Sequence, residues 1–204
     1  MNKNKRLFKN NVQMVIYLII AFLIIWAFIY LGKQNFKTDV KDDHEKFNID
    51  YSLVDGNNVF EYANSSVVRL MLNKGEGIIF FGTNKSNWVN HYAKILNDVA
   101  LSTGVNKIYY YDFLEDRNNN NGTYESIVEK LSEYVTINDM GIKDIYAPTL
   151  VIIKNDKVLL FDDETSFIKG TATPSEYWTS ERVSEKTQEL SEKMLEFLGV
   201  GYGE

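Results

Sequence analysis

The longest apolar stretch of the chain lies near its amino terminus. Residues 14–31 read MVIYLIIAFLIIWAFIYL, which is 18 consecutive apolar or aromatic residues. That length reaches the range needed to cross a bilayer as a helix, and aromatic rings lie near both of its ends, where the membrane interface favours them. The pattern predicts a transmembrane anchor over 12–31, preceded by a short basic tail over 1–11.

A cleaved signal peptide is the alternative for this segment. Signal peptides have a shorter apolar region and small residues at a cleavage site. Here the run ends in Ile29-Tyr30-Leu31-Gly32 with no Ala-x-Ala pattern, so the uncleaved anchor is preferred. Four basic residues precede the run and four follow it within Gly32–Lys46, so the positive-inside count is balanced. Because long domains translocate largely regardless of charge, we expect a single-pass protein of the cell membrane with its folded domain outside.

Three regions follow the predicted anchor. Residues 32–50 are polar and charged, which predicts a linker before a folded domain over 51–198 and a loose tail over 199–204. The run Asp42-Asp43-His44-Glu45 in the linker is interpreted as solvated charge and not as a metal site, because nothing in a linker fixes ligand geometry.

Within the folded domain, apolar runs of strand length alternate with apolar residues at helical spacing. The runs predict strands over 58–62, 78–81, 107–113, 149–153 and 158–161. The spacing predicts helices over 64–73, from residue 86 to Gly104, over 124–135 and over 180–198, with a loop over 116–122. The helix between the two central strands makes them parallel, and the short turn at 154–157 makes the last two antiparallel. The predicted fold class is therefore α/β, with a mixed sheet flanked by helices.

Composition excludes several classes of function. The net charge is −6, and four of the 22 basic residues precede the apolar run, so the folded domain is acidic. An acidic domain argues against nucleic-acid binding, which depends on neutralising phosphates. The chain has no cysteine, which excludes disulfides, thiolate nucleophiles and cysteine metal sites. We expect no metal and no small-molecule cofactor.

Two segments resemble the thioredoxin superfamily. Residues 78–89 (IIFFGTNKSNWV) resemble the strand and active-site turn of thioredoxins, and residues 146–158 (YAPTLVIIKNDKV) resemble the cis-proline segment and the hairpin after it. With KIYYYDF over 107–113 and the Asn-rich loop that follows, they are similar to the bacteriocin transport accessory proteins and related secreted thioredoxin-like proteins. The resemblance covers about residues 58–198 and implies a thioredoxin-like sheet preceded by one transmembrane helix.

The chain departs from this family at the redox centre. The family has Cys-Pro-Trp-Cys where this chain has Ser86-Asn87-Trp88-Val89. Disulfide exchange needs a thiolate and a second, resolving thiol, so we predict a redox-inactive domain that is not an enzyme. Ser86 is predicted to cap the following helix through its side-chain oxygen. A serine hydrolase is disfavoured, because neither His44 nor His91 is placed to serve as a base.

The resemblance also implies a binding surface. It implies a cis peptide bond before Pro148, with Tyr146 and Ala147 leading into it and the backbone of Ala147 pairing with bound peptide. This segment and the degenerate turn would form one shallow surface around Trp88. Trp88 is either an exposed binding anchor or a side chain packed on its helix, since tryptophan serves both roles.

These expectations converge on a function. We predict a membrane-anchored, redox-inactive thioredoxin-like protein that binds a peptide or protein partner at the cell envelope, in an accessory or chaperone-like role. Two alternatives are a redox component that works with a partner's cysteines and a purely structural subunit of a membrane assembly.

Overall fold

A five-stranded mixed sheet forms the centre of the protein in a computed structural model, which describes residues 40–84, 86–168 and 172–200. The strands are β1 (Phe60–Tyr62), β2 (Gly77–Gly82), β3 (Ile108–Asp112), β4 (Thr149–Lys154) and β5 (Lys157–Asp162), in the order β1-β3-β2-β4-β5. β3 pairs in parallel with β1 and β2, whereas β4 is antiparallel to both β2 and β5. The predicted α/β class, parallel central strands and final hairpin are confirmed.

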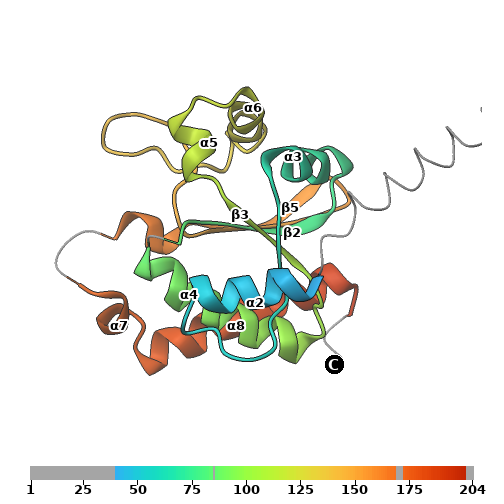
Figure 1. Cartoon of the computed structure of the whole chain (residues 1–204), viewed down its shortest axis with the longest axis vertical. Coiled ribbons are helices and arrows are strands. Elements are labelled where there is room, and N and C mark those ends of the chain that lie inside the picture. The colour runs from blue at the N-terminus through green and yellow to red at the C-terminus, as the bar shows by residue number, and fades with distance from the viewer. Residues whose placement is uncertain (1–39, 85, 169–171, 201–204) are drawn as a thin grey trace, which may run out of the picture. The chain divides into compact units, whose positions relative to one another are not determined.

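Helices cover both faces of this sheet (Figure 1). One face carries α3 (Ser65–Lys74), α5 (Leu114–Asn118) and α6 (Gly122–Lys130), and the other carries α2 (Val40–Asp50), α4 (Asn87–Thr103) and α8 (Ser180–Leu198). A 3-10 turn, η1 (Glu164–Phe167), and the short helix α7 (Pro174–Tyr177) lie between β5 and α8. This arrangement is compatible with a thioredoxin-like fold.

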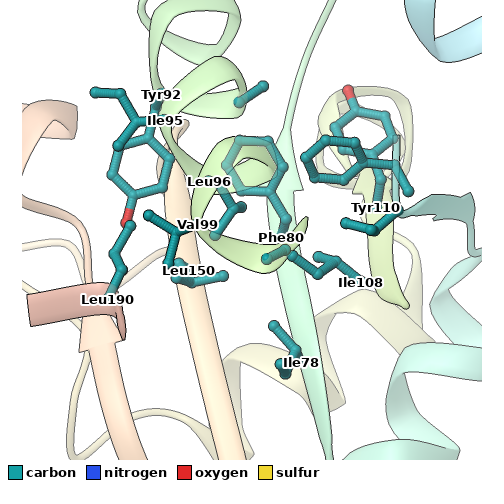
Figure 2. Packing of buried hydrophobic residues seen from close by; sticks show 14 of the residues in the cluster. Ile78, Phe80, Tyr92, Ile95, Leu96, Val99, Ile108, Tyr110, Leu150 and Leu190 are labelled. Carbon is teal, nitrogen blue, oxygen red and sulfur yellow. The ribbon is translucent and has the colours of Figure 1, made fainter. Parts of the chain in front are cut away.

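The two faces bury separate hydrophobic clusters. Ile78 and Phe80 of β2 belong to the cluster under α4 and α8, whereas Ile79 and Phe81 belong to the cluster under α3 and α6. Figure 2 shows the first cluster, in which side chains of α4 such as Leu96 meet those of β2, β3 and β4. Successive strand residues point to opposite faces, so a strand covered on both sides has the continuous apolar run seen in the sequence.

Local signals set several element boundaries. The Asn64 side chain caps α3 by accepting a hydrogen bond from the backbone N–H of Val67 at 3.0 Å. Gly104, with φ of 85°, ends α4 in the left-handed conformation. Asn155 and Asp156, with φ of 52° and 62°, form the turn between β4 and β5. Positive φ at both central residues is typical of the turn type that matches the twist of a two-residue hairpin.

Helix α2 corrects the predicted linker. Residues 40–50 are helical, and Phe47 is fully buried, with its ring centroid 3.9 Å from that of Phe60 in β1. Tyr51, directly after the helix, is also fully buried. The linker prediction is therefore wrong for residues 40–50. The helix is so rich in charge that its composition hid the two aromatic side chains that dock it on the sheet.

The charge run in α2 has structural partners. An Asp43 carboxylate oxygen accepts a hydrogen bond from the backbone N–H of Tyr62 at 3.1 Å, and the Nδ1 atom of His44 lies 3.0 Å from the Oδ1 atom of Asn58. These contacts join α2 to β1 and the residues just before it. The interpretation of the run as solvated charge is thus wrong for Asp43 and His44. Among the described residues, no group of three or more potential ligands could hold a metal ion.

The boundaries around α5 and α6 also differ from the prediction. The expected loop over 116–122 is helical in part, because α5 ends at Asn118. α6 then begins at Gly122, where the Asn121 side chain accepts hydrogen bonds from the backbone N–H groups of Thr123 and Tyr124. α6 ends at Lys130 and not at residue 135, although Leu131 and Val135 remain buried. The apolar spacing thus correctly marked buried positions beyond the end of the helix itself.

The predicted anchor over 12–31 and the tail beyond residue 200 lie outside the described residues. In the portion that is described, no helix combines the length and the apolar character required to cross a membrane.

Candidate functional site

Three loops meet at one end of the sheet, where the central strands β2 and β3 terminate. The parallel strands β2 and β3 end side by side, with Gly82 opposite Asp112. The antiparallel strand β4 begins beside the end of β2, with Thr149 opposite Phe81. The degenerate turn after β2, the segment after β3 and the Pro148 segment before β4 therefore share this end of the sheet, which we call the carboxyl edge.

The start of α4 corrects the role predicted for Ser86. Ser86 occupies the N-cap position with extended backbone angles, but its side chain makes no capping hydrogen bond. Its backbone N–H instead donates to the carbonyl of Thr83 at 3.1 Å, which closes the turn. The prediction of a side-chain cap is wrong. Backbone torsion angles place a residue at the N-cap, whereas its side-chain torsion angle decides whether the hydroxyl reaches a backbone N–H group.

This difference gives a test with a matched control. Replacing Asn64 with alanine is expected to lower the free energy of unfolding by about 1 kcal/mol, because it removes a side-chain cap. Replacing Ser86 with alanine is expected to change it by less than about 0.5 kcal/mol. Urea unfolding followed by circular dichroism measures both. An equal loss for Ser86→Ala would show that its hydroxyl caps α4 in solution.

Val89, at the last position of the degenerate turn, belongs to the core. It is fully buried, and a Cβ atom built on Gly82 would lie only 2.9 Å from the Cγ1 atom of Val89 and 2.7 Å from the Tyr110 ring. Glycine at position 82 is thus required by close packing. The position that holds a cysteine in the resembled family here holds an apolar side chain that packs α4 onto β2.

Trp88 packs on a helix that the sequence did not reveal. It is half-buried, and its ring lies edge-on to Tyr177 of α7 with 5.6 Å between centroids. Tyr177 in turn donates a hydrogen bond to Glu164. Burial and this hydrogen bond raise the pKa of Tyr177 to about 12, so the phenol stays protonated at neutral pH. Trp88 is therefore neither fully exposed nor packed only on its own helix.

His91 is engaged elsewhere than at Ser86. Its Nδ1 atom lies 3.0 Å from the backbone carbonyl of Asn87, and its Nε2 atom lies 3.2 Å from the hydroxyl of Ser175 in α7. Both ring nitrogens thus have partners, one within α4 and one that ties α4 to α7. The geometry gives no support to a nucleophilic Ser86.

The Pro148 segment is held on several sides. The Ala147–Pro148 peptide bond is cis, as the resemblance implied. The Tyr146 carbonyl accepts a hydrogen bond from the Thr149 hydroxyl at 2.6 Å, and the Pro148 carbonyl accepts one from the Ser166 hydroxyl at 2.5 Å. These bonds occupy the carbonyls on either side of Ala147.

Ala147 keeps its backbone groups unused. Neither its N–H nor its carbonyl is hydrogen-bonded to any residue within the described part of the chain. Its side chain packs against both hydrophobic clusters, so the residue is fixed in place. A fixed backbone with a free donor and a free acceptor is a pairing position for an extended chain.

Arg117 in α5 supports the same segment. Its Nη1 atom donates to the carbonyl of Ile145 at 3.3 Å. Its guanidinium carbon lies 5.2 Å from the ring centroid of Phe113 and 5.8 Å from that of Tyr146. The sequence indicated no role for Arg117, because its hydrogen-bond partner Ile145 is 28 residues away along the chain and only the tertiary structure brings the two together.

A polar cavity lies beside the degenerate turn. Its volume is about 520 Å³, and it lies between the end of β2 and helix α5. The lining contains two carboxylates, three side-chain amides, one hydroxyl and one leucine: Asp112, Glu115, Asn84, Asn118, Asn119, Thr83 and Leu114. The volume is in the range that accepts a small ligand or a few side chains. The lining favours polar groups that both donate and accept hydrogen bonds.

An exposed apolar tip leads into the Pro148 segment. Ile137, Met140 and Ile142 are 56%, 78% and 48% exposed. The Asn138 side-chain oxygen accepts hydrogen bonds from the backbone N–H groups of Met140 and Ile142, and its Nδ2 atom donates to the Tyr146 hydroxyl at 2.6 Å. The hydrogen bond from Asn138 to Tyr146 therefore ties the apolar tip to the Pro148 segment.

The comparisons with known proteins add no identification. No protein-family model matches the chain, and no curated protein matches it. The case for a function therefore depends on the geometry of the carboxyl edge.

Proposed function

We propose that the domain is a non-catalytic module that binds an extended segment of a peptide or protein partner along the carboxyl edge. The observation that carries this proposal is the unused backbone of Ala147 between two carbonyls, those of Tyr146 and Pro148, that are both hydrogen-bonded. Main-chain pairing provides affinity for any extended chain, and the neighbouring pockets provide selectivity.

Two different surfaces adjoin the loops of the carboxyl edge. The polar cavity beside α5 suits a hydrogen-bonding side chain of the partner, and the apolar tip around Met140 suits an aliphatic or aromatic one. An exposed apolar group next to a structured polar site is typical of protein-recognition surfaces. The partner segment that fits best therefore carries both a polar and an apolar side chain near its pairing residue.

The chemistry of the edge supports binding without catalysis. The chain has no thiol for disulfide exchange, and no base among the described residues is hydrogen-bonded to the Ser86 hydroxyl. The apolar stretch over 14–31 supports a location at the cell envelope, where the module would act as an accessory or chaperone-like factor.

Site-specific photo-crosslinking of the full chain in intact cells tests the proposal. A benzophenone amino acid at position 118, in the cavity, and at position 140, on the tip, is expected to form adducts with the same partner. Position 49 is the control, since Ile49 is 75% exposed on α2 at the other face of the sheet. Met140→Asp is expected to lower the adduct yield from position 118 about 10-fold, whereas Ile49→Asp is not. Equal adducts from all three positions, or none from 118 and 140, would contradict the proposal.

The two alternatives give different results in the same cells. Disulfide reduction by the captured complex, and not by the partner alone, would favour a redox role that uses the partner's cysteines. Adducts from position 192, on the exposed side of α8, with none from 118 or 140, would favour a structural assembly subunit.

A further inference from the structure

The two edge strands of the sheet differ in how their outer backbone groups are protected. β1, at one edge, has only three residues, and its outer N–H groups are taken by side chains: Tyr62 N–H by Asp43, and Phe60 N–H by Asn58. α2 also packs on this strand. Natural proteins cover or shorten edge strands in this way because unpaired edges recruit other chains.

β5, at the other edge, carries a β-bulge at Leu159, but no side chain of the described residues caps its outer backbone groups in the way that Asp43 and Asn58 cap β1. It is six residues long and pairs on one side with β4. The backbone groups on its outer side make no hydrogen bond to any residue in the ranges that the structure describes. Four consecutive apolar residues, Val158–Phe161, are each only half-buried, and Tyr134, itself 43% exposed, stacks on Phe161. The outer side of β5 thus presents backbone N–H and C=O groups that have no partner in the described chain, with apolar side chains on both faces of the strand.

The charges at the two ends of β5 indicate what pairs with it. Lys157 is exposed at the start of the strand, and Asp163 directly follows its end. Neither side chain has an ion-pair or hydrogen-bond partner among the described residues. An antiparallel second copy would bring Lys157 of each strand to the Asp163 end of the other, whereas a parallel copy would bring like charges together. The antiparallel arrangement is also the one that a twofold axis produces.

We propose that two copies of the chain associate through the outer edges of their β5 strands, paired antiparallel into one continuous ten-stranded sheet. The pairing satisfies both ladders, covers the half-exposed apolar residues and joins two Lys157–Asp163 pairs. The register shift between the Ile152 and Ile153 pairings leaves Leu159 without a partner on β4, so β5 carries a β-bulge within Lys157–Asp162. The dimer leaves the carboxyl edge of each copy for its own partner, so this inference does not depend on the proposed function.

Charge reversal with rescue tests the dimer. Sedimentation velocity of the purified full chain in mild detergent measures its dissociation constant. Lys157→Glu and Asp163→Lys are each expected to weaken dimerisation about 10-fold or more, because each sets like charges face to face. The double variant is expected to return to within about threefold of the wild type, because it restores opposite charges. Lys130→Glu on exposed α6 is the control and is expected to have no effect.

The absence of native cysteine allows a second, independent readout. Leu160→Cys, near the middle of β5, is expected to give a disulfide-linked dimer on mild oxidation. Leu101→Cys, on the exposed surface of α4, is expected to stay monomeric at the same protein concentration. A wild-type chain that sediments as a monomer, or a double charge variant that does not recover, overturns the proposal. Circular dichroism of each variant separates loss of pairing from loss of folding.

Discussion

Replacing Phe47 with alanine is expected to lower the free energy of unfolding by about 3–5 kcal/mol. Phe47 is fully buried and stacks on Phe60. It also lies edge-on to Tyr110, with 5.2 Å between the ring centroids of Phe47 and Tyr110. Truncation would leave a cavity among aromatic rings that cannot collapse around it, so the transfer term and the cavity term add. The size of the loss measures whether α2 belongs to the folded domain.

The same helix supplies the control. Ile49 is 75% exposed, and Ile49→Ala is expected to change the free energy of unfolding by less than about 0.5 kcal/mol. Urea unfolding followed by tryptophan fluorescence and circular dichroism measures both variants. A loss below about 1 kcal/mol for Phe47→Ala would mean that α2 is a dispensable linker after all.

Replacing Lys186 with methionine is expected to cost about 3–5 kcal/mol of stability. The Lys186 side chain is only 7% exposed, and its Nζ atom lies 2.9 Å from a carboxylate oxygen of Asp162, which is 4% exposed. Glu164 and Glu189 approach the same Nζ atom at 2.8 Å and 2.6 Å. Without the ammonium group, Asp162 would remain as a buried charge whose remaining hydrogen-bond donors are the Tyr92 hydroxyl and the backbone N–H of Glu164.

Two further variants isolate the cause of this loss. Lys193→Met removes an exposed lysine of the same helix, paired with Glu196, and is expected to cost less than about 1 kcal/mol. Adding Asp162→Asn to Lys186→Met is expected to recover most of the loss, because the neutral amide still accepts from Tyr92 and leaves no unpaired charge. A double variant as unstable as Lys186→Met would show that the lysine acts through packing of its alkyl chain.

The cluster also has a pH dependence with a defined sign. Burial by itself would lower the pKa of Lys186, but the surrounding carboxylates raise it above the ordinary lysine value. Its contribution is therefore fully present at neutral pH and is lost only in strong alkali. Burial opposes the ionisation of Glu164, yet hydrogen bonds from Lys186 and Tyr177 leave its pKa below the ordinary value of 4.5. The Glu164 contribution is present above that pH and is lost as the pH falls, so the gap between wild type and Lys186→Met is expected to narrow in acid.

Much of the fold follows from local sequence. The unbroken apolar run of β2 predicted a strand covered on both faces, because adjacent residues must each enter a different core. The Asn155-Asp156 turn predicted the hairpin, because asparagine and aspartate tolerate positive φ. The spacing of apolar residues in α8 marked a helix over 180–198, and the structure has the same bounds. In each case the controlling forces act between residues within a few positions of one another.

What only the tertiary structure decided lies in contacts between distant residues. The sequence by itself determined an α/β domain that has no thiol of its own for disulfide exchange, since the absence of cysteine needs no structure to interpret. It did not reveal that Phe47 docks α2 on β1, that Arg117 supports the Pro148 segment or that Tyr177 covers Trp88. Nor did it show that β1 is protected while β5 is open. A buried contact or a free backbone group depends on which elements the fold brings together, and a pattern of neighbouring residues carries no record of that pairing.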